Sequence, residues 1–147
     1  MSITFWVPEA PRSTQRSPCP FCEGSGVVAY VEGLDCGYCG GHGWAEEEVS
    51  ELPEINMSNH NAYSFLMELG LEADCCGSIP VSAMDDLAVK LTLLSCGITS
   101  AFLEEEPRSE GIITYCGRDT QYVQARAKEL LALVKQAKAK NYSVTWG

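Results

Sequence analysis

The chain has 147 residues, of which 46% are hydrophobic, and its formal net charge is −10. This composition predicts a packed core and excludes wholesale disorder, and the longest apolar runs are too short to cross a bilayer. The charge is uneven, because residues 1–117 contain four basic and eighteen acidic side chains, whereas residues 118–147 contain six basic and two acidic ones.

The first eighteen residues combine a short apolar stretch with a polar stretch that contains prolines. Residues 3–7 have the β-branched and aromatic character of a short strand, and the remainder is typical of a tether. We therefore expect residues 1–18 to form an extended N-terminal segment. The N-terminus lacks the basic-then-apolar layout of a secretory signal, so we expect a reducing compartment, the cytoplasm.

Residues 19–43 contain the pattern C-x-x-C-x-G-x-G twice, first in residues 19–26 and again in residues 36–43. Each Cys-x-x-Cys turn can direct two sulfurs at one ion, and two such turns complete a four-cysteine shell. Glycine allows the positive φ of a tight turn, in which backbone N–H groups point at the sulfurs. The pattern predicts one zinc ion per chain, bound by Cys19, Cys22, Cys36 and Cys39.

Other uses of these cysteines stay open at this point. An all-thiolate shell also suits a single iron ion, and a Cys-x-x-Cys pair can form a disulfide or act as a redox dithiol. A redox motif needs only one pair, so two glycine-rich copies favour zinc. Residues 27–33, between the copies, predict a short strand that ends at a turn, within a hairpin that brings the two knuckles together.

The repeated pattern resembles the cysteine-rich zinc domain of DnaJ-type co-chaperones. That family carries four repeats and two zinc ions, whereas this chain carries two repeats, enough for one zinc ion. The resemblance covers residues 19–43 only, and a J-domain is not implied because the sequence contains no His-Pro-Asp tripeptide. It implies zinc binding by the four cysteines and a protein-docking role for a DnaJ-like module at residues 19–44.

Residues 45–55 are rich in glutamate and predict an acidic linker. Residues 56–147 then predict a mainly α-helical domain with three helices. The first follows a cap-rich entry at residues 56–61 and ends at Gly70. The second follows a capping box at residues 82–85 and ends at Gly97.

The third and longest helix is expected to be capped by Asp119 or Thr120. Two short strands, at residues 111–115 and 142–146, are expected to pair across it. The predicted fold class is therefore α+β: a small zinc-knuckle β-hairpin module followed by a mainly helical domain.

Four further cysteines fit no common zinc spacing, and we expect them to be buried or half-buried thiols. A second metal site and a catalytic role are the alternatives for this set: Cys75, Cys76, Cys96 and Cys116. His42 is expected at the surface and Trp44 is expected to cover the metal. His60 could act as a base beside a thiol, but a helix-capping role is favoured.

The sequence shows no nucleophile–base pair, phosphate loop or His-rich catalytic metal shell, and we assign no catalytic residue. Because only Arg12 and Arg16 are basic around the zinc module, nucleic-acid binding through it is disfavoured. We expect a non-enzymatic zinc-binding adaptor with an acidic surface, whose partner is another protein and not a membrane. One alternative is a chaperone-like or thiol–disulfide activity of DnaJ-like type. Another is an inhibitor, of phage or mobile-element type, that blocks a nucleic-acid-binding protein through its acidic surface.

Overall fold

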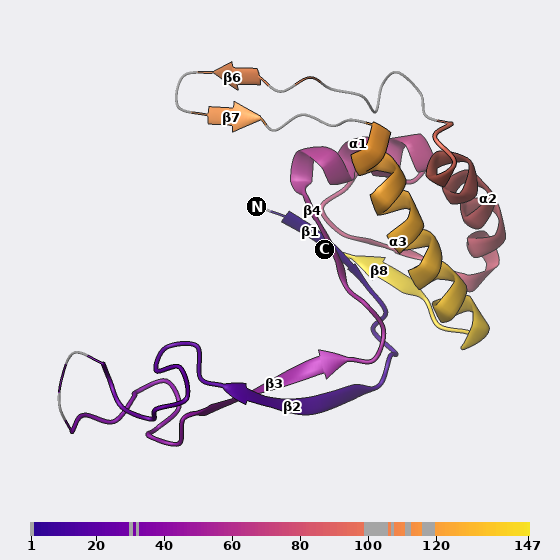
Figure 1. The fold of residues 1–147 in the computed structure, drawn as a ribbon. Coiled ribbons are helices and arrows are strands. Elements are labelled where there is room, and N and C mark those ends of the chain that lie inside the picture. Colours follow the sequence, from indigo (N-terminus) through magenta and orange to yellow (C-terminus); the bar gives the residue numbers. More distant parts are fainter. Residues whose placement is uncertain are drawn as a thin grey trace. The chain divides into compact units, whose positions relative to one another are not determined.

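The computed structural model divides the chain into two compact units, which are described separately (Figure 1). It describes residues 2–29, 31, 33–98, 106, 108–110, 113–115 and 120–147. The first unit, called here the α+β unit, comprises Met1–Ala10 and Leu52–Gly147, and the second, the knuckle unit, comprises Pro11–Glu51. Within the described residues, no helix combines the length and apolar character needed to cross a membrane.

The α+β unit contains a four-stranded antiparallel sheet and three α-helices among its described residues, which confirms the α+β class. The sheet has the order β4-β1-β8-β5, with bounds β4 (Ile55–Ser58), β1 (Ser2–Trp6), β8 (Val144–Trp146) and β5 (Gly77–Ile79). The helices are α1 (Asn59–Leu69), α2 (Met84–Ser95), which follows the 3₁₀ helix η1 (Val81–Ala83), and α3 (Thr120–Ala139). Strands β6 (Arg108–Glu110) and β7 (Ile113–Tyr115) form a separate hairpin.

The core of this unit follows from the periodicity of its strands. Side chains alternate between the two faces of a strand, so Ile3 and Phe5 of β1 are buried together. Their register partners Met57 and Ile55 on β4 are buried as well. On the other side of β1, Trp146 of β8 is opposite Phe5, with the ring centroids 6.2 Å apart. The three helices contribute buried leucines to the same core, including Leu91 of α2 and Leu130 of α3.

The short strand expected at residues 3–7 is confirmed as β1, which lies inside the sheet between β4 and β8. One expectation about the strands is wrong. The C-terminal strand does not pair with residues 113–115, because β8 pairs with β1 and β5 while β7 pairs with β6. The alternation of apolar residues along a strand identifies its buried face, but it does not identify the distant strand with which it pairs. The remainder of the predicted strand, residues 111–112, lies outside the described residues.

The ends of α1 agree with the prediction, whereas the start of α2 does not. Helix α1 is capped by the Ser58 hydroxyl, which accepts from the N–H of Asn61, and it ends at Gly70 with φ 72°. The capping box at residues 82–85 is wrong, because Ser82 lies in η1 and no side chain caps α2 at Ala83. Thr120, one of the two caps predicted for α3, is instead its first helical residue, and the other, Asp119, lies outside the described residues.

The knuckle unit contains a two-stranded antiparallel ribbon made of β2 (Arg12–Pro18) and β3 (Trp44–Ser50). The strands pair over seven residues, and every residue of β2 is exposed. Arg16 forms an ion pair with Glu46 across the ribbon, at 2.7 Å. Residues 12–18 of the expected tether and residues 45–50 of the expected acidic linker are thus paired strands. Their polar sequence did not indicate strands, because a ribbon without a buried face needs no alternation of apolar and polar residues.

Helix α2 offers a matched test of this core, since Leu91 is fully buried and Leu93 is 46% exposed. We expect Leu91→Ala to lower the free energy of unfolding by about 2–5 kcal/mol, because it leaves a cavity. Leu93→Ala should change it by less than about 0.5 kcal/mol. Urea unfolding followed by far-UV circular dichroism measures both. Equal losses from the two variants would contradict the assigned helix face.

Candidate metal centre

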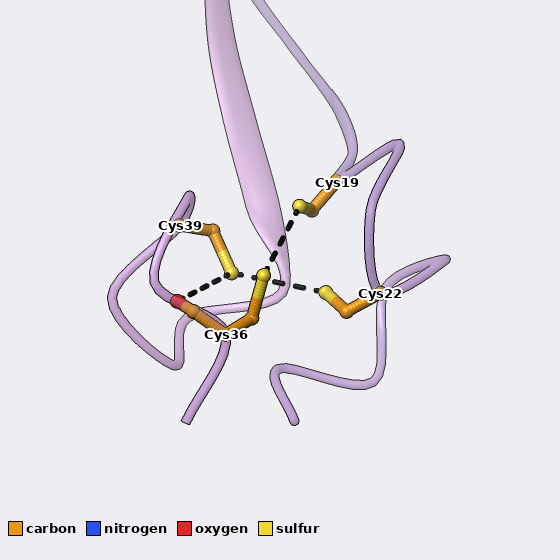
Figure 2. Close-up of side chains that lie close together, drawn as sticks. All are labelled: Cys19, Cys22, Cys36 and Cys39. Atoms are coloured by element: carbon orange, nitrogen blue, oxygen red, sulfur yellow. Dashed lines mark hydrogen bonds between the residues drawn. The ribbon is translucent and has the colours of Figure 1, made fainter. Parts of the chain in front are cut away.

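The structure brings together the four cysteines of the two knuckles (Figure 2). Their sulfur atoms all lie within 4.8 Å of one another. The Sγ atoms of Cys19 and Cys36 are 3.9 Å apart, and those of Cys22 and Cys39 are 3.8 Å apart. Four thiolates about 2.3 Å from one ion form a tetrahedron whose edges are about 3.8 Å. The four sulfurs therefore fit a single tetrahedral metal ion.

Backbone groups of the repeated glycines support the sulfurs in the same way in both knuckles. The N–H of Gly26 donates to Cys22 Sγ at 3.3 Å, and the N–H of Gly43 donates to Cys39 Sγ at 3.2 Å. These glycines occupy the last position of each motif, and both have φ 77°. A Cβ on Gly26 would collide with the carbonyl oxygen of Gly41, and a Cβ on Gly43 would collide with that of Gly24. Glycine is thus required by conformation and by space.

The same segments join the two knuckles to each other and to the ribbon. The N–H of Cys36 donates to the Gly26 carbonyl at 2.8 Å, and the N–H of Cys19 donates to the Gly43 carbonyl at 2.9 Å. The predicted strand at residues 27–33 is wrong for its described part, which contains only a single bridge between Val27 and Asp35. Residues 30 and 32 lie outside the described residues. Backbone bonds at the motif glycines, rather than a strand between the copies, hold the knuckles face to face.

Burial raises the pKa of the Cys19 and Cys22 thiols, whereas hydrogen bonds from backbone N–H groups lower it. Burial raises the pKa of the Cys19 thiol to about 11. At Cys22 burial also opposes ionisation, but the Gly26 N–H and the neighbouring Cys19 outweigh it and lower the pKa to about 7. A bound cation favours the thiolate form of its cysteine ligands. Three of the sulfurs belong to buried residues and Cys39 is half-buried. An ion bound by all four sulfurs would have a closed shell of protein ligands.

An aromatic pair beside the metal centre was missed from the sequence. The rings of Phe21 and Tyr38 lie 4.7 Å apart, centroid to centroid. Both residues are strongly exposed, at 71% and 62%. A signal for the pair was present, because each Cys-x-x-Cys turn carries an aromatic residue in its third position.

Trp44 and His42 line an open groove of about 670 Å³ next to Cys39. The groove is completed by Arg16, Tyr38, Ala45 and Glu46. Trp44 is 57% exposed, and its expected role as a cover of the four-cysteine cluster stays a prediction. His42 is exposed as predicted and lies outside the four-sulfur cluster.

The cysteines outside the knuckles depart from expectation. Cys75, Cys76 and Cys96 are exposed rather than buried, and Cys116 lies outside the described residues. Within the part of the chain that the structure describes, only the knuckle cysteines form a group of three or more side chains that could share an ion. His60, the candidate base, is exposed on α1.

Comparisons with protein-family models, with curated proteins and with solved structures found no match to this chain. The site is accordingly interpreted from its own geometry. That geometry shows a four-cysteine cluster that could hold a metal ion.

The motif glycines provide a prediction that leaves every sulfur in place. Gly43→Ala should weaken metal affinity about 10–100-fold, because it displaces the N–H that supports Cys39. Gly37→Ala is the matched control, since a Cβ there meets nothing within 4 Å. Competition with a chromogenic chelator measures both affinities. Equal affinities for the two variants would show that the Gly43 geometry does not support the site.

Proposed function

We propose that the four-cysteine site holds one structural zinc ion and that the knuckle unit is a non-enzymatic protein-docking module of DnaJ-like type. The observation that carries the proposal is the closed, largely buried tetrahedron of sulfurs. Zinc is a standard occupant of such sites, and four protein ligands leave no position open for a substrate. The DnaJ-like part of the proposal is supported by the two C-x-x-C-x-G-x-G repeats of the sequence.

A structural role is supported by what else the knuckle unit buries. Among its described residues, the buried hydrophobic ones are Cys19, Cys22 and Cys36, all of them proposed ligands. The strands β2 and β3 contain no buried residue. An isolated two-stranded ribbon is only marginally stable in water. Metal coordination would therefore take the place of a hydrophobic core in this unit.

A docking role is supported by the aromatic surface next to the centre. Phe21, Tyr38 and Trp44 are all more than half exposed, and Tyr38 and Trp44 line the groove. Exposed aromatic side chains that gather around a recess are typical of binding surfaces, where Trp and Tyr often dominate the energy. The zinc-bound knuckles would hold these rings in a fixed arrangement, which lowers the entropy lost on binding.

Charge indicates the kind of partner. The sequence of the knuckle unit contains seven acidic residues, two arginines and no lysine. Four thiolates on Zn²⁺ add a further formal charge of roughly −2. The module would thus repel phosphate backbones and attract a protein surface with lysine or arginine around an apolar recess. An inhibitor that mimics nucleic acid would use the same charge, but it would not depend on the aromatic groove.

Substitutions in the groove test the docking role. We expect Tyr38→Ala and Trp44→Ala to retain zinc but to lower capture of a protein partner from lysate about tenfold or more each, because each removes a large contact side chain. Leu34→Ala is the control, since Leu34 is an exposed apolar residue of the same unit. Quantitative mass spectrometry of the captured proteins measures the change.

Two results would contradict the docking proposal. Capture that survives both aromatic substitutions but disappears at raised salt would favour the acidic-mimic alternative. Capture that is unchanged in Cys36→Ser, a variant without the full metal shell, would show that the zinc-bound knuckles do not form the docking surface.

A further inference from the structure

Two neighbouring thiols of the α+β unit remain outside the metal centre. Cys75 and Cys76 follow each other in the chain just before β5, and both are exposed. Their Sγ atoms are 4.0 Å apart. Both thiols are thus exposed, and their sulfurs are close enough to bond to each other after the side-chain and peptide torsions change.

The loop that carries this pair is tied to the buried end of the sheet. The Asp74 carboxylate accepts the N–H of Cys75 at 2.7 Å, and the Asp74 carbonyl accepts the indole N–H of Trp146 at 3.1 Å. Trp146 is buried in β8. Its ring lies against Gly77, where an added Cβ would collide with it. The position of the two thiols is therefore set by the packing of the C-terminal strand.

We propose that Cys75 and Cys76 form a reversible redox site, which closes to a vicinal disulfide by exchange with a low-molecular-weight disulfide such as glutathione disulfide. The thiolate of Cys76 attacks the small disulfide, forms a mixed disulfide and releases one small thiolate. The thiolate of Cys75 then attacks Cys76 Sγ and releases the second small thiolate. Two protein thiols are oxidised and one small disulfide is reduced to two thiols, whose sulfurs take up the two protons.

The order of attack follows from the Asp74 carboxylate. A hydrogen bond of the Cys75 thiol to the Asp74 side chain, together with the adjacent Cys76, raises the pKa of Cys75, which lowers the thiolate fraction of Cys75 at neutral pH. Cys76 is therefore assigned the first attack and Cys75 the resolving step. This order does not involve the zinc ligands, so the site is independent of the proposed metal function.

Chain geometry makes the closed form labile. Consecutive Cα atoms are about 3.8 Å apart across a trans peptide, whereas disulfides usually join Cα atoms about 4.4–6.8 Å apart. A disulfide between adjacent residues is thus strained and is reduced more readily than a structural one. Such a pair suits reversible exchange with small thiols and disulfides. Closure of the disulfide would also disturb the hydrogen bond between the Asp74 carbonyl and the Trp146 indole.

The experiment uses the full, zinc-loaded chain in buffers of graded glutathione redox ratio. Intact-mass spectrometry with peptide mapping should show the loss of two hydrogen atoms at residues 75–76, with unchanged zinc content and full reversal by reduced glutathione. Hydrogen exchange should change in β5 and β8 on closure, since these strands flank the Asp74–Trp146 bond.

Two variants test the order of attack. Cys75→Ser should accumulate a mixed disulfide on Cys76. Cys76→Ser should react with glutathione disulfide at a rate at least about tenfold lower than that of Cys75→Ser.

Cys96→Ser is the control, because Cys96 is an exposed thiol of the same unit and the variant should oxidise at residues 75–76 like the parent. Three results would overturn the proposal. The pair could stay reduced at every ratio tested, each thiol could carry its own stable glutathione adduct, or the mapped disulfide could join either residue to Cys96 or to a second chain.

Discussion

The convergence of four cysteine sulfurs is the constraint on which the knuckle unit depends. Every residue of β2 is exposed, β3 contains no buried residue, and the buried hydrophobic side chains among the residues described in this unit are Cys19, Cys22 and Cys36. Backbone bonds link this cluster directly to the ribbon, since Cys19 follows β2 and its N–H pairs with Gly43, which precedes β3. An ion that holds the sulfurs would therefore also hold the ends of both strands. The exposed rings of Phe21 and Tyr38 lie on the same two turns as the four cysteines, so metal coordination would also fix the positions of these rings.

The α+β unit is held together by ordinary apolar packing. Its central strands come from opposite ends of the chain, because β1 lies beside β8. Phe5 and Trp146 meet across that pair of strands, and helix α3 adds a row of buried leucines. If a metal ion stabilises the knuckle unit as proposed, the two units use different sources of stability, and a chelator should affect them unequally.

Local features of this fold were predictable from the sequence, whereas its long-range features were not. The motif glycines, the Gly70 helix end and the four-cysteine cluster depend on a few neighbouring residues, and the structure has them as predicted. The pairing of β1 with β8 depends on residues about 140 positions apart, and no short pattern specifies it.

Other misses have equally definite causes. The ribbon of β2 and β3 has no apolar face, so its acidic and polar residues suggested a linker and a tether. The exposure of Cys75 and Cys76 was missed because cysteine is usually buried, and the loop between α1 and β5 has no periodicity from which exposure can be inferred. The groove beside Cys39 joins residues of both strands and the second knuckle, so it required the ribbon register to be known.

The central claim is that a metal ion replaces a hydrophobic core in the knuckle unit. Hydrogen exchange of the full chain, with and without a chelator and alongside zinc analysis, tests this most directly. The account predicts about one zinc ion per chain. It also predicts that chelation removes amide protection from residues 12–18 and 44–50 while α2 and α3 keep theirs. A metal-free protein whose ribbon amides stay protected would contradict it.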